Sequence, residues 1–284
     1  MAPNIVPLLP PHTVYCEPFA GGLAVMFAKG LPSRSSNASY YKEIVNDLDK
    51  DLFNFYGVLI DSDKNKELMF MLENTPCSLD FHSIAKQENN NDSDIVSAWK
   101  YFINISQSFS NCKDGSWSTG IQGKKQGATW RNKKNNINNV IQRLSEIHID
   151  NIDAIRFASR YNGACVLHYC DPPYPSAVMD YQHKYTVEQY IELIEYAEQS
   201  TSSFVISCYD VPGVKPKGCK TYSFDAHMSA CNTKTITDRK RTEKLYVWDR
   251  SNGDMPDDIK KNLWLAKDDS YPYNEVKQLE LFGV

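Results

Sequence analysis

The residues with the clearest chemical meaning are Asp171, Pro172, Pro173 and Tyr174, at the end of an apolar run that begins at residue 166. A buried strand that ends in this order presents a carboxylate, then two residues with a fixed φ and no N–H group, and then an aromatic ring. Because proline makes up about 5% of residues, a chance match in a chain of this length is roughly one in a thousand. The alternative is a proline-stiffened turn in which Tyr174 packs as an ordinary aromatic side chain.

Two further acids stand at the ends of strand-like runs. Glu17 begins the sequence Glu17-Pro18-Phe19-Ala20-Gly21-Gly22, and Asp47 follows the run 42–46. Adjacent glycines let a backbone approach a ligand closely. The pattern is neither GxGxxG nor a Walker motif, which disfavours a dinucleotide or ATP. Asp47 could accept hydrogen bonds from ribose hydroxyls, so the combination suits a nucleoside without phosphates. The alternative for both acids is helix N-capping.

Strand-like and helix-like runs alternate through much of the chain. Strands are expected at 13–17, 42–46, 164–171, 204–209 and 244–248. Helices are expected at 23–29, at 187–197, and at the i, i+3, i+4, i+7 repeat of Leu52, Phe55, Tyr56 and Leu59. This alternation predicts a parallel, doubly wound α/β sheet. Ligands of such sheets bind beyond the carboxyl ends of the strands, at the point where the strand order reverses.

The alternation breaks between residues 62 and 148. This stretch holds a polar, low-complexity segment at 87–94, and the residues after it are rich in aromatic side chains, glycine and serine. Four apolar residues then mark an amphipathic helix: Ile137, Val140, Ile141 and Leu144. The opposite face of this helix is basic and rich in asparagine. We therefore expect one domain formed by 1–61 and 149–284, with 62–148 as a mostly helical insertion.

The basic residues are concentrated in two segments of a chain of 284 residues whose formal net charge is −4. Residues 112–143 contain seven Lys and Arg against only Asp114, and residues 215–244 contain eight against three acids. Two basic segments in an acidic chain indicate a nucleic-acid face. The alternative is two solvated loops. No apolar stretch approaches the roughly 20 residues of a membrane helix.

The eight cysteines form no CxxC pair, so a zinc site is not expected. Three of them, Cys16, Cys170 and Cys208, lie in strand-like runs and are expected to be small buried residues of a protein in a reducing compartment. The first 14 residues contain four prolines and no basic region, which is not typical of a secretory signal.

At three places the chain resembles the Dam-like, α-group DNA adenine-N6 methyltransferases. The segments are Glu17-Pro18-Phe19-Ala20-Gly21-Gly22, Asn46-Asp47-Leu48-Asp49-Lys50-Asp51-Leu52 and Asp171-Pro172-Pro173-Tyr174, in the family's order. The insertion stands where the family keeps its target-recognition region, and 241–248 resembles its late strand. The resemblance implies a Rossmann-like methyltransferase sheet, S-adenosylmethionine as methyl donor and double-stranded DNA as partner. It implies that the reaction needs no metal and that the protein does not bind a membrane. It also implies that the protein is located in the cytoplasm or, in a eukaryote, in the nucleus.

The resemblance also implies roles for individual residues. Asp171 and the carbonyl of Pro172 would accept the two N–H bonds of an adenine N6 amine, Pro173 would fix their geometry, and Tyr174 would stack on the flipped base. The implied cofactor-binding residues are Glu17, Pro18, Phe19, Ala20, Gly21, Asp47, Leu48, Asp153 and Asp171. Asp153 matches the place where the family has an acid near the cofactor adenine; the alternative is a simple loop acid.

The insertion is expected to hold the DNA. The side chains expected to contact it are Lys124, Lys125, Arg131, Lys133, Lys134, Trp117 and Trp130. Cations attract the phosphates, while amides and aromatic rings can read or wedge bases. The alternative is that both tryptophans belong to the core of the insertion and that only the lysines touch DNA.

The chain departs from the family at its start. The family has an aromatic residue and a Gly-Gly-Lys segment before the first strand, whereas no glycine precedes Gly21 here. We expect either a truncated start or a substitute for this segment, with a consequence for cofactor affinity more than for the fold. The rival functions are methylation of another amino group, such as cytosine N4, RNA adenine or a protein glutamine, and a catalytically silent DNA-binding protein.

Overall fold

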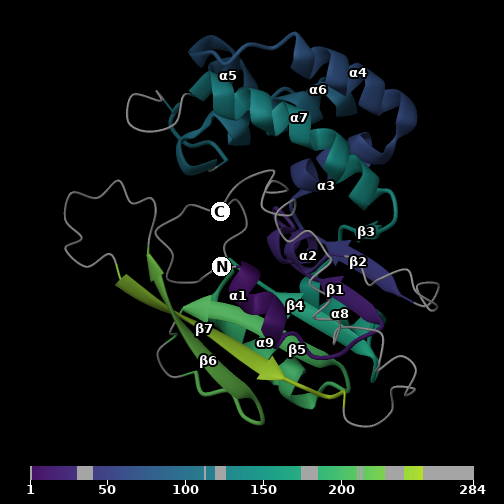
Figure 1. Cartoon of the computed structure of the whole chain (residues 1–284), viewed down its shortest axis with the longest axis vertical. Coiled ribbons are helices and arrows are strands. Elements are labelled where there is room, and N and C mark those ends of the chain that lie inside the picture. The colour runs from purple at the N-terminus through teal and green to yellow at the C-terminus, as the bar shows by residue number, and fades with distance from the viewer. Residues whose placement is uncertain are drawn as a thin grey trace, which may run out of the picture. The chain divides into compact units, whose positions relative to one another are not determined.

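The computed structural model describes residues 2–30, 41–111, 113–118, 126–173, 185–209, 211, 214–227 and 240–251. These residues form two compact units, one made of 2–48 and 148–251 and the other of 49–147. The first unit contains the sheet and the second is helical (Figure 1).

The first unit is built on a seven-stranded sheet with the order β3-β2-β1-β4-β5-β7-β6. Its strands are β1 (Val14–Glu17), β2 (Lys42–Asn46), β3 (His148–Asp150), β4 (Val166–Cys170), β5 (Ser203–Tyr209), β6 (Lys220–His227) and β7 (Lys240–Trp248). The first five in sequence pair in parallel, and β7 runs antiparallel to both of its neighbours. The expected α/β fold with a Rossmann-like, mostly parallel sheet is confirmed.

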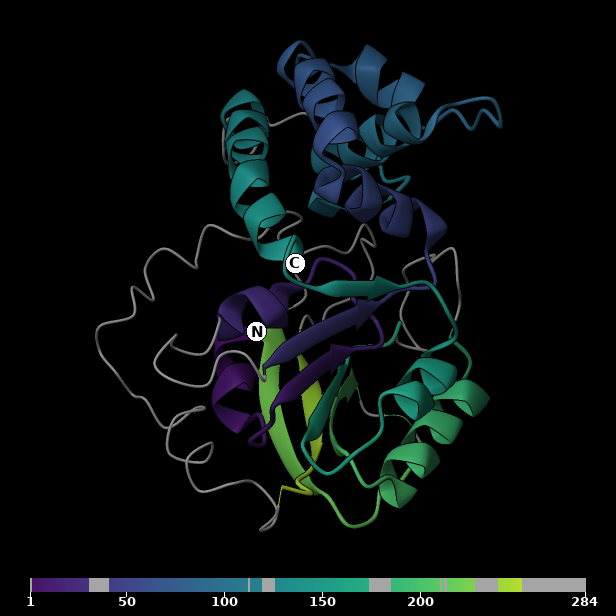
Figure 2. The same ribbon diagram turned by 90° about the vertical axis from the view of Figure 1, so that its right-hand side faces the viewer.

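Helices cover both faces of this sheet (Figure 2). The short helices α1 (Ala2–Ile5) and η1 (Val6–Leu8) lie with α2 (Ala24–Lys29) on one face, and α8 (Ala154–Arg160) and α9 (Val187–Gln199) lie on the other. Strands that are covered on both sides are buried along their length, which explains their nearly continuous apolar sequence.

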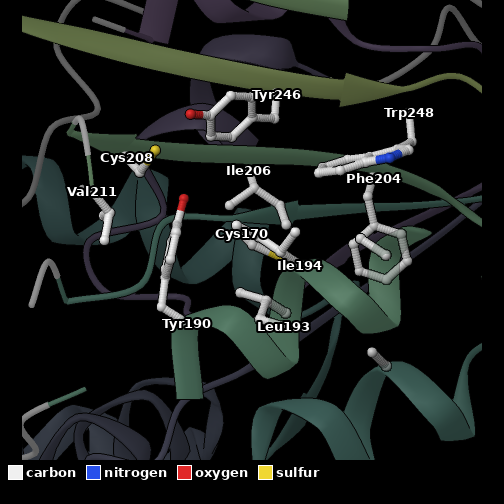
Figure 3. Packing of buried hydrophobic residues seen from close by; sticks show 12 residues of the cluster. Cys170, Tyr190, Leu193, Ile194, Phe204, Ile206, Cys208, Val211, Tyr246 and Trp248 are labelled. Carbon is white, nitrogen blue, oxygen red and sulfur yellow. The ribbon is translucent and has the colours of Figure 1, made fainter. Parts of the chain in front are cut away.

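The core beneath α9 shows how helix and strand periods combine. Tyr190, Leu193 and Ile194 of α9 recur on one face of the helix and meet alternate residues of the strands (Figure 3). The strand residues in this cluster are Cys170, Phe204, Ile206, Cys208, Tyr246 and Trp248. Cys16, Cys170 and Cys208 are buried and unoxidised, as expected for small core residues.

The opposite face of the sheet contains a buried ion pair. Lys29 of α2 lies 2.5 Å from the Glu43 carboxylate of β2, and both side chains are almost completely buried. Lys29 also contacts the hydroxyl of Tyr41 and lies 4.4 Å from the ring centre of Tyr15. Because a buried charge is costly without a partner, this pairing fixes α2 against β2.

The second unit consists of the helices α3 (Lys50–Ile60), α4 (Ser62–Glu73), α5 (Leu79–Ala85), α6 (Asp94–Gln107), η3 (Phe109–Asn111) and α7 (Gln126–Leu144). Its core is aromatic, with Phe55 stacked on Phe102 at 5.7 Å between ring centres and Trp130 5.5 Å from Phe102. Helix α3, which was expected to belong with the sheet, joins this unit because Phe55 packs into that cluster. In the described part of the chain, no helix is both long and apolar enough to cross a membrane.

Candidate functional site

The strand order of the sheet reverses between β1 and β4. From this point β1, β2 and β3 extend to one side, and β4 and β5 to the other. Parallel strands place their carboxyl ends at a common edge, and ligands of such sheets bind there. The acids predicted to belong to the site follow the strands at this edge or end them: Glu17, Asp47, Asp153 and Asp171.

Glu17, the last residue of β1, is fully buried. Its Oε1 atom accepts hydrogen bonds from the Tyr15 hydroxyl at 2.6 Å and from the backbone N–H of Met26 at 2.9 Å. Met26 lies in the first turn of α2, whose N-cap residue is Leu23, so the Glu17 side chain satisfies one of the N–H groups at the start of that helix. Burial raises the pKa of Glu17 to about 8, although both hydrogen bonds act in the opposite direction. Contact of Glu17 with a cofactor stays a prediction.

The loop between β1 and α2 is held to the end of β2. The backbone N–H of Ala20 donates to the Asn46 carbonyl at 2.8 Å, and that of Gly21 donates to Oδ2 of Asp47 at 2.9 Å. Gly21 has a φ of +45°, a left-handed conformation that favours glycine. The structure therefore brings Asp47 together with the glycine loop. Asp47 is half-buried, and the neighbouring Leu48 side chain is 48% exposed.

Asn46 joins three loops at this edge, a role that the sequence analysis did not assign to it although it lies in one of the family-like segments. Its Nδ2 donates to the carbonyl of Pro18 at 3.0 Å and to that of Ile152 at 2.9 Å. Its Oδ1 accepts from the backbone N–H of Ile152 at 2.9 Å. The side chain is buried, so these bonds are shielded from water. The loops after β1, β2 and β3 are thus positioned by one amide.

The loop after β3 carries Asp153, and the rings of Phe19 and Tyr185 meet in the loops that follow β1 and precede α9. Asp153 is exposed and accepts a hydrogen bond from the backbone N–H of Arg156, which makes it the N-cap of α8. Phe19 and Tyr185 meet edge to face at 5.3 Å between ring centres. Burial raises the pKa of the Tyr185 hydroxyl, and the negative charge of Asp153 acts in the same direction.

Tyr185 was not singled out in the sequence. It stands just before α9, where Thr186 and Gln189 form a reciprocal capping box that fixes the start of the helix. The capping pattern is a local signal that could have located the helix start, but no local signal pairs Tyr185 with Phe19.

Asp171 directly follows β4 and is exposed, whereas Pro172 is buried and Pro173 half-buried. Tyr174 lies outside the described residues. Behind this loop, Tyr169 is fully buried, and its pKa is raised first by burial and then by the charges of Asp171, Glu17 and Glu243. Asp171 thus stands at a strand end that the adjacent prolines hold rigid.

Buried polar side chains next to Tyr169 extend from β4 across β5 to β7. Ser207 of β5 donates to Oε1 of Glu243 of β7 at 2.7 Å, and Ser207 also hydrogen-bonds the Tyr169 hydroxyl. Buried polar groups that are satisfied in this way rigidify the backbone around them. The strand that ends at Asp171 is thus stabilised by hydrogen bonds among Tyr169, Ser207 and Glu243.

The described residues of the insertion that were expected to contact DNA differ in exposure. Trp130 is buried, and its Nε1 donates to the Thr75 carbonyl at 2.9 Å, so it belongs to the core as the alternative proposes. Trp117 is half-buried and pairs with Ser108 through the backbone. Lys124 and Lys125 lie outside the described residues.

The three cations of α7 that were expected to contact DNA also differ in their surroundings. Lys133 donates to the Ser106 carbonyl at 3.1 Å, and burial lowers its pKa to about 8. Lys134 donates to the Leu72 carbonyl at 3.0 Å, near the end of α4. Arg131 is exposed. A role in DNA binding stays a prediction for all three, and in this structure Arg131 is the most accessible of them.

Comparisons with known proteins agree with this geometry. A search of curated protein sequences found no match. Among solved structures, the rRNA methyltransferase AviRa from Streptomyces viridochromogenes covers 89% of this chain and 84% of its own at 8% identity, but its TM-score of 0.36 is too low to support an argument. A family model described as D12 class N6 adenine-specific DNA methyltransferase matches residues 1–242. The chain therefore belongs to the D12 class of N6 adenine-specific DNA methyltransferases.

Proposed function

We propose that the chain transfers the methyl group of S-adenosylmethionine to N6 of an adenine turned out of the DNA duplex. Membership of the family makes the chain a DNA adenine-N6 methyltransferase. The donor, the flipped base and the residue roles are the proposal. The observation that carries it is the position of Asp171-Pro172-Pro173 at the carboxyl end of β4, across the switch point from the glycine loop of β1.

The proposed role of Asp171 and Pro172 follows from the chemistry of the amine. The lone pair of adenine N6 is delocalised into the ring, so the nitrogen is a weak nucleophile. Two acceptors that take both N–H bonds draw the nitrogen toward tetrahedral geometry and localise the lone pair. The Asp171 carboxylate and the Pro172 carbonyl can act as these acceptors, and the adjacent prolines fix their geometry before the base arrives.

The residues at the same edge fit a nucleoside-type methyl donor. A Cβ at Gly21 would meet no atom within 4 Å, so the glycine leaves open space beside the loop. Asp47 offers a carboxylate to hydroxyl groups, and Leu48, Phe19 and Tyr185 offer apolar surface to a base. When bound, S-adenosylmethionine supplies a methyl group activated by its sulfonium. We propose that Asp47 holds its ribose and that Asp153 lies near its adenine.

Incubation with labelled S-adenosylmethionine and unmethylated DNA tests the proposed function. Label is expected in N6-methyladenine, and not in cytosine, RNA or protein. Label in any of those other acceptors would contradict the proposal and support a methyltransferase for another amino group. A chain that binds DNA but takes up neither the donor nor label would be a silent DNA-binding protein.

Replacing Asp47 by alanine is expected to weaken donor binding while DNA affinity stays unchanged. Hydrogen bonds to charged groups contribute about 1.5–3 kcal/mol, so the donor Kd is expected to rise roughly 10- to 150-fold. Isothermal titration calorimetry with S-adenosylmethionine measures this change directly.

The variant Asp47→Asn serves as the matched control for this experiment. Its amide oxygen can still accept from the Gly21 backbone N–H, which the native Oδ2 atom binds at 2.9 Å. The loop is then retained while the negative charge is lost, so a smaller rise in Kd is expected than for alanine. Unchanged donor affinity in a folded Asp47→Ala protein would reject the ribose assignment.

A further inference from the structure

Helix α7 presents an exposed face made almost entirely of amide side chains. The exposed residues toward this side are Arg131, Asn132, Asn135, Asn138, Asn139 and Gln142. At 3.6 residues per turn these six positions fall within about one third of the helix circumference. The buried residues of the helix are Trp130, Asn136, Ile137, Val140 and Leu144. The amides therefore form one continuous stripe on the side away from the core.

The packing of the unit gives no reason for this composition. Asparagine is among the weaker helix formers, because its side chain competes for backbone hydrogen bonds. Asn139 donates to Asn136 at 3.1 Å. Among the described residues, the side chains of Asn132, Asn135 and Asn138 make no hydrogen bond. Exposed side chains that favour a helix poorly and make no hydrogen bond within their own unit point to an external partner.

The charge of α7 identifies the class of that partner. Between Gln126 and Leu144 the helix contains no Asp or Glu, and Arg131 stands exposed at the start of the stripe. A surface without carboxylates can approach a phosphate backbone without repulsion, and an exposed guanidinium can bind phosphate. An amide stripe flanked by positive charge is complementary to a nucleic acid.

We propose that this face of α7 lies in the major groove of the substrate DNA and that Asn132, Asn135 and Asn138 read adenines of the recognition site. The inference rests on the proposed function, which makes duplex DNA the substrate. The major groove of B-DNA admits an α-helix, and an Asn amide can accept from adenine N6–H while it donates to N7. The deep, narrow major groove of an RNA helix does not admit such a face.

The test compares two DNA duplexes that differ only in the adenine N7 acceptor. The preferred site is first selected from a random pool of duplexes by binding, and is then made with adenine or with 7-deazaadenine, which lacks N7. The wild type is expected to bind the 7-deaza duplex about 5- to 150-fold more weakly. The triple variant Asn132→Ala/Asn135→Ala/Asn138→Ala is expected to bind both duplexes with the same weakened affinity, because the lost partner is shared.

A matched control removes three exposed amides outside α7. Gln87→Ala/Asn90→Ala/Asn91→Ala alters the polar loop before α6 and is expected to discriminate between the duplexes as the wild type does. Alanine favours helix more than asparagine, so circular dichroism of the α7 variant should show intact helix. The proposal is overturned if the α7 variant keeps wild-type discrimination, or if the wild type binds both duplexes equally. A wild type that binds selectively but transfers no methyl group contradicts only the proposed function, because this test measures binding.

Discussion

Replacing Asp171 by alanine is expected to slow methyl transfer by about a hundredfold to a thousandfold or more, while the protein stays folded and bound to DNA. The loss removes a preorganised acceptor aimed at the reacting amine, and removal of one such electrostatic group typically costs this much. Asp171 is exposed, so its truncation leaves no cavity in the core. Single-turnover transfer of labelled methyl groups to duplex DNA measures the effect on the chemical step.

Asp249 provides a matched control for this substitution. It is also an exposed aspartate directly after a strand, but it follows β7, which runs antiparallel to its neighbours. Asp249 therefore lies at the opposite edge of the sheet from Asp171. Asp249→Ala is expected to retain the wild-type rate of transfer. A near-normal rate of methyl transfer in Asp171→Ala would contradict the proposed mechanism, whatever the rate of the control variant.

The parts of the fold that the sequence predicted are those with a local signature. The strand Lys42–Asn46 was expected with its observed bounds, because its apolar run ends at a polar pair. The helix expected at 187–197 from its apolar periodicity is likewise observed, as α9 (Val187–Gln199). Chemical groups that follow strand ends share an edge once the sheet is parallel, so the placement of Asp47 and Asp171 at one edge follows from topology.

The features that were not predicted depend on contacts between distant segments. Strand β3 is three residues long, and its pairing with β2 brings together segments about a hundred residues apart in sequence. The assignment of α3 to the helical unit depends on Phe55 meeting Phe102. Trp130 could have faced DNA or the core, and only its hydrogen bond to Thr75 and its burial distinguish these cases.

Asn46 is the clearest example of a residue whose role the sequence does not reveal, although it begins one of the family-like segments. An asparagine before an aspartate has many ordinary uses, and the amide acquires its importance only when Pro18 and Ile152 arrive beside it. Its partners are separated from it by 28 and 106 residues. No periodic or short-range pattern carries that information.

Replacing Asn46 by alanine is expected to weaken donor binding and to slow methyl transfer by roughly a hundredfold, the cost in rate of misplacing reacting groups by about 1 Å. The substitution removes all three side-chain hydrogen bonds and leaves two carbonyls and one N–H without their buried partner. The loops that carry Phe19, Asp47 and Asp153 then lose a common anchor. Calorimetric Kd values for S-adenosylmethionine and the separate KM and kcat values of the variant measure this effect.

Because the same substitution also costs stability, a control must separate loosening of the site from general unfolding. Each buried polar group that loses its hydrogen-bond partner lowers the free energy of unfolding by about 1–3 kcal/mol. Ile44→Ala creates a cavity on the same strand β2, beneath α8. This cavity is expected to lower the free energy of unfolding by about 2–5 kcal/mol. Ile44 lies in the sheet core rather than at its edge, so this variant is expected to lower Tm and keep the donor Kd. If both variants lower Tm equally and neither changes the Kd, Asn46 supports the fold alone and the loops find their geometry without it.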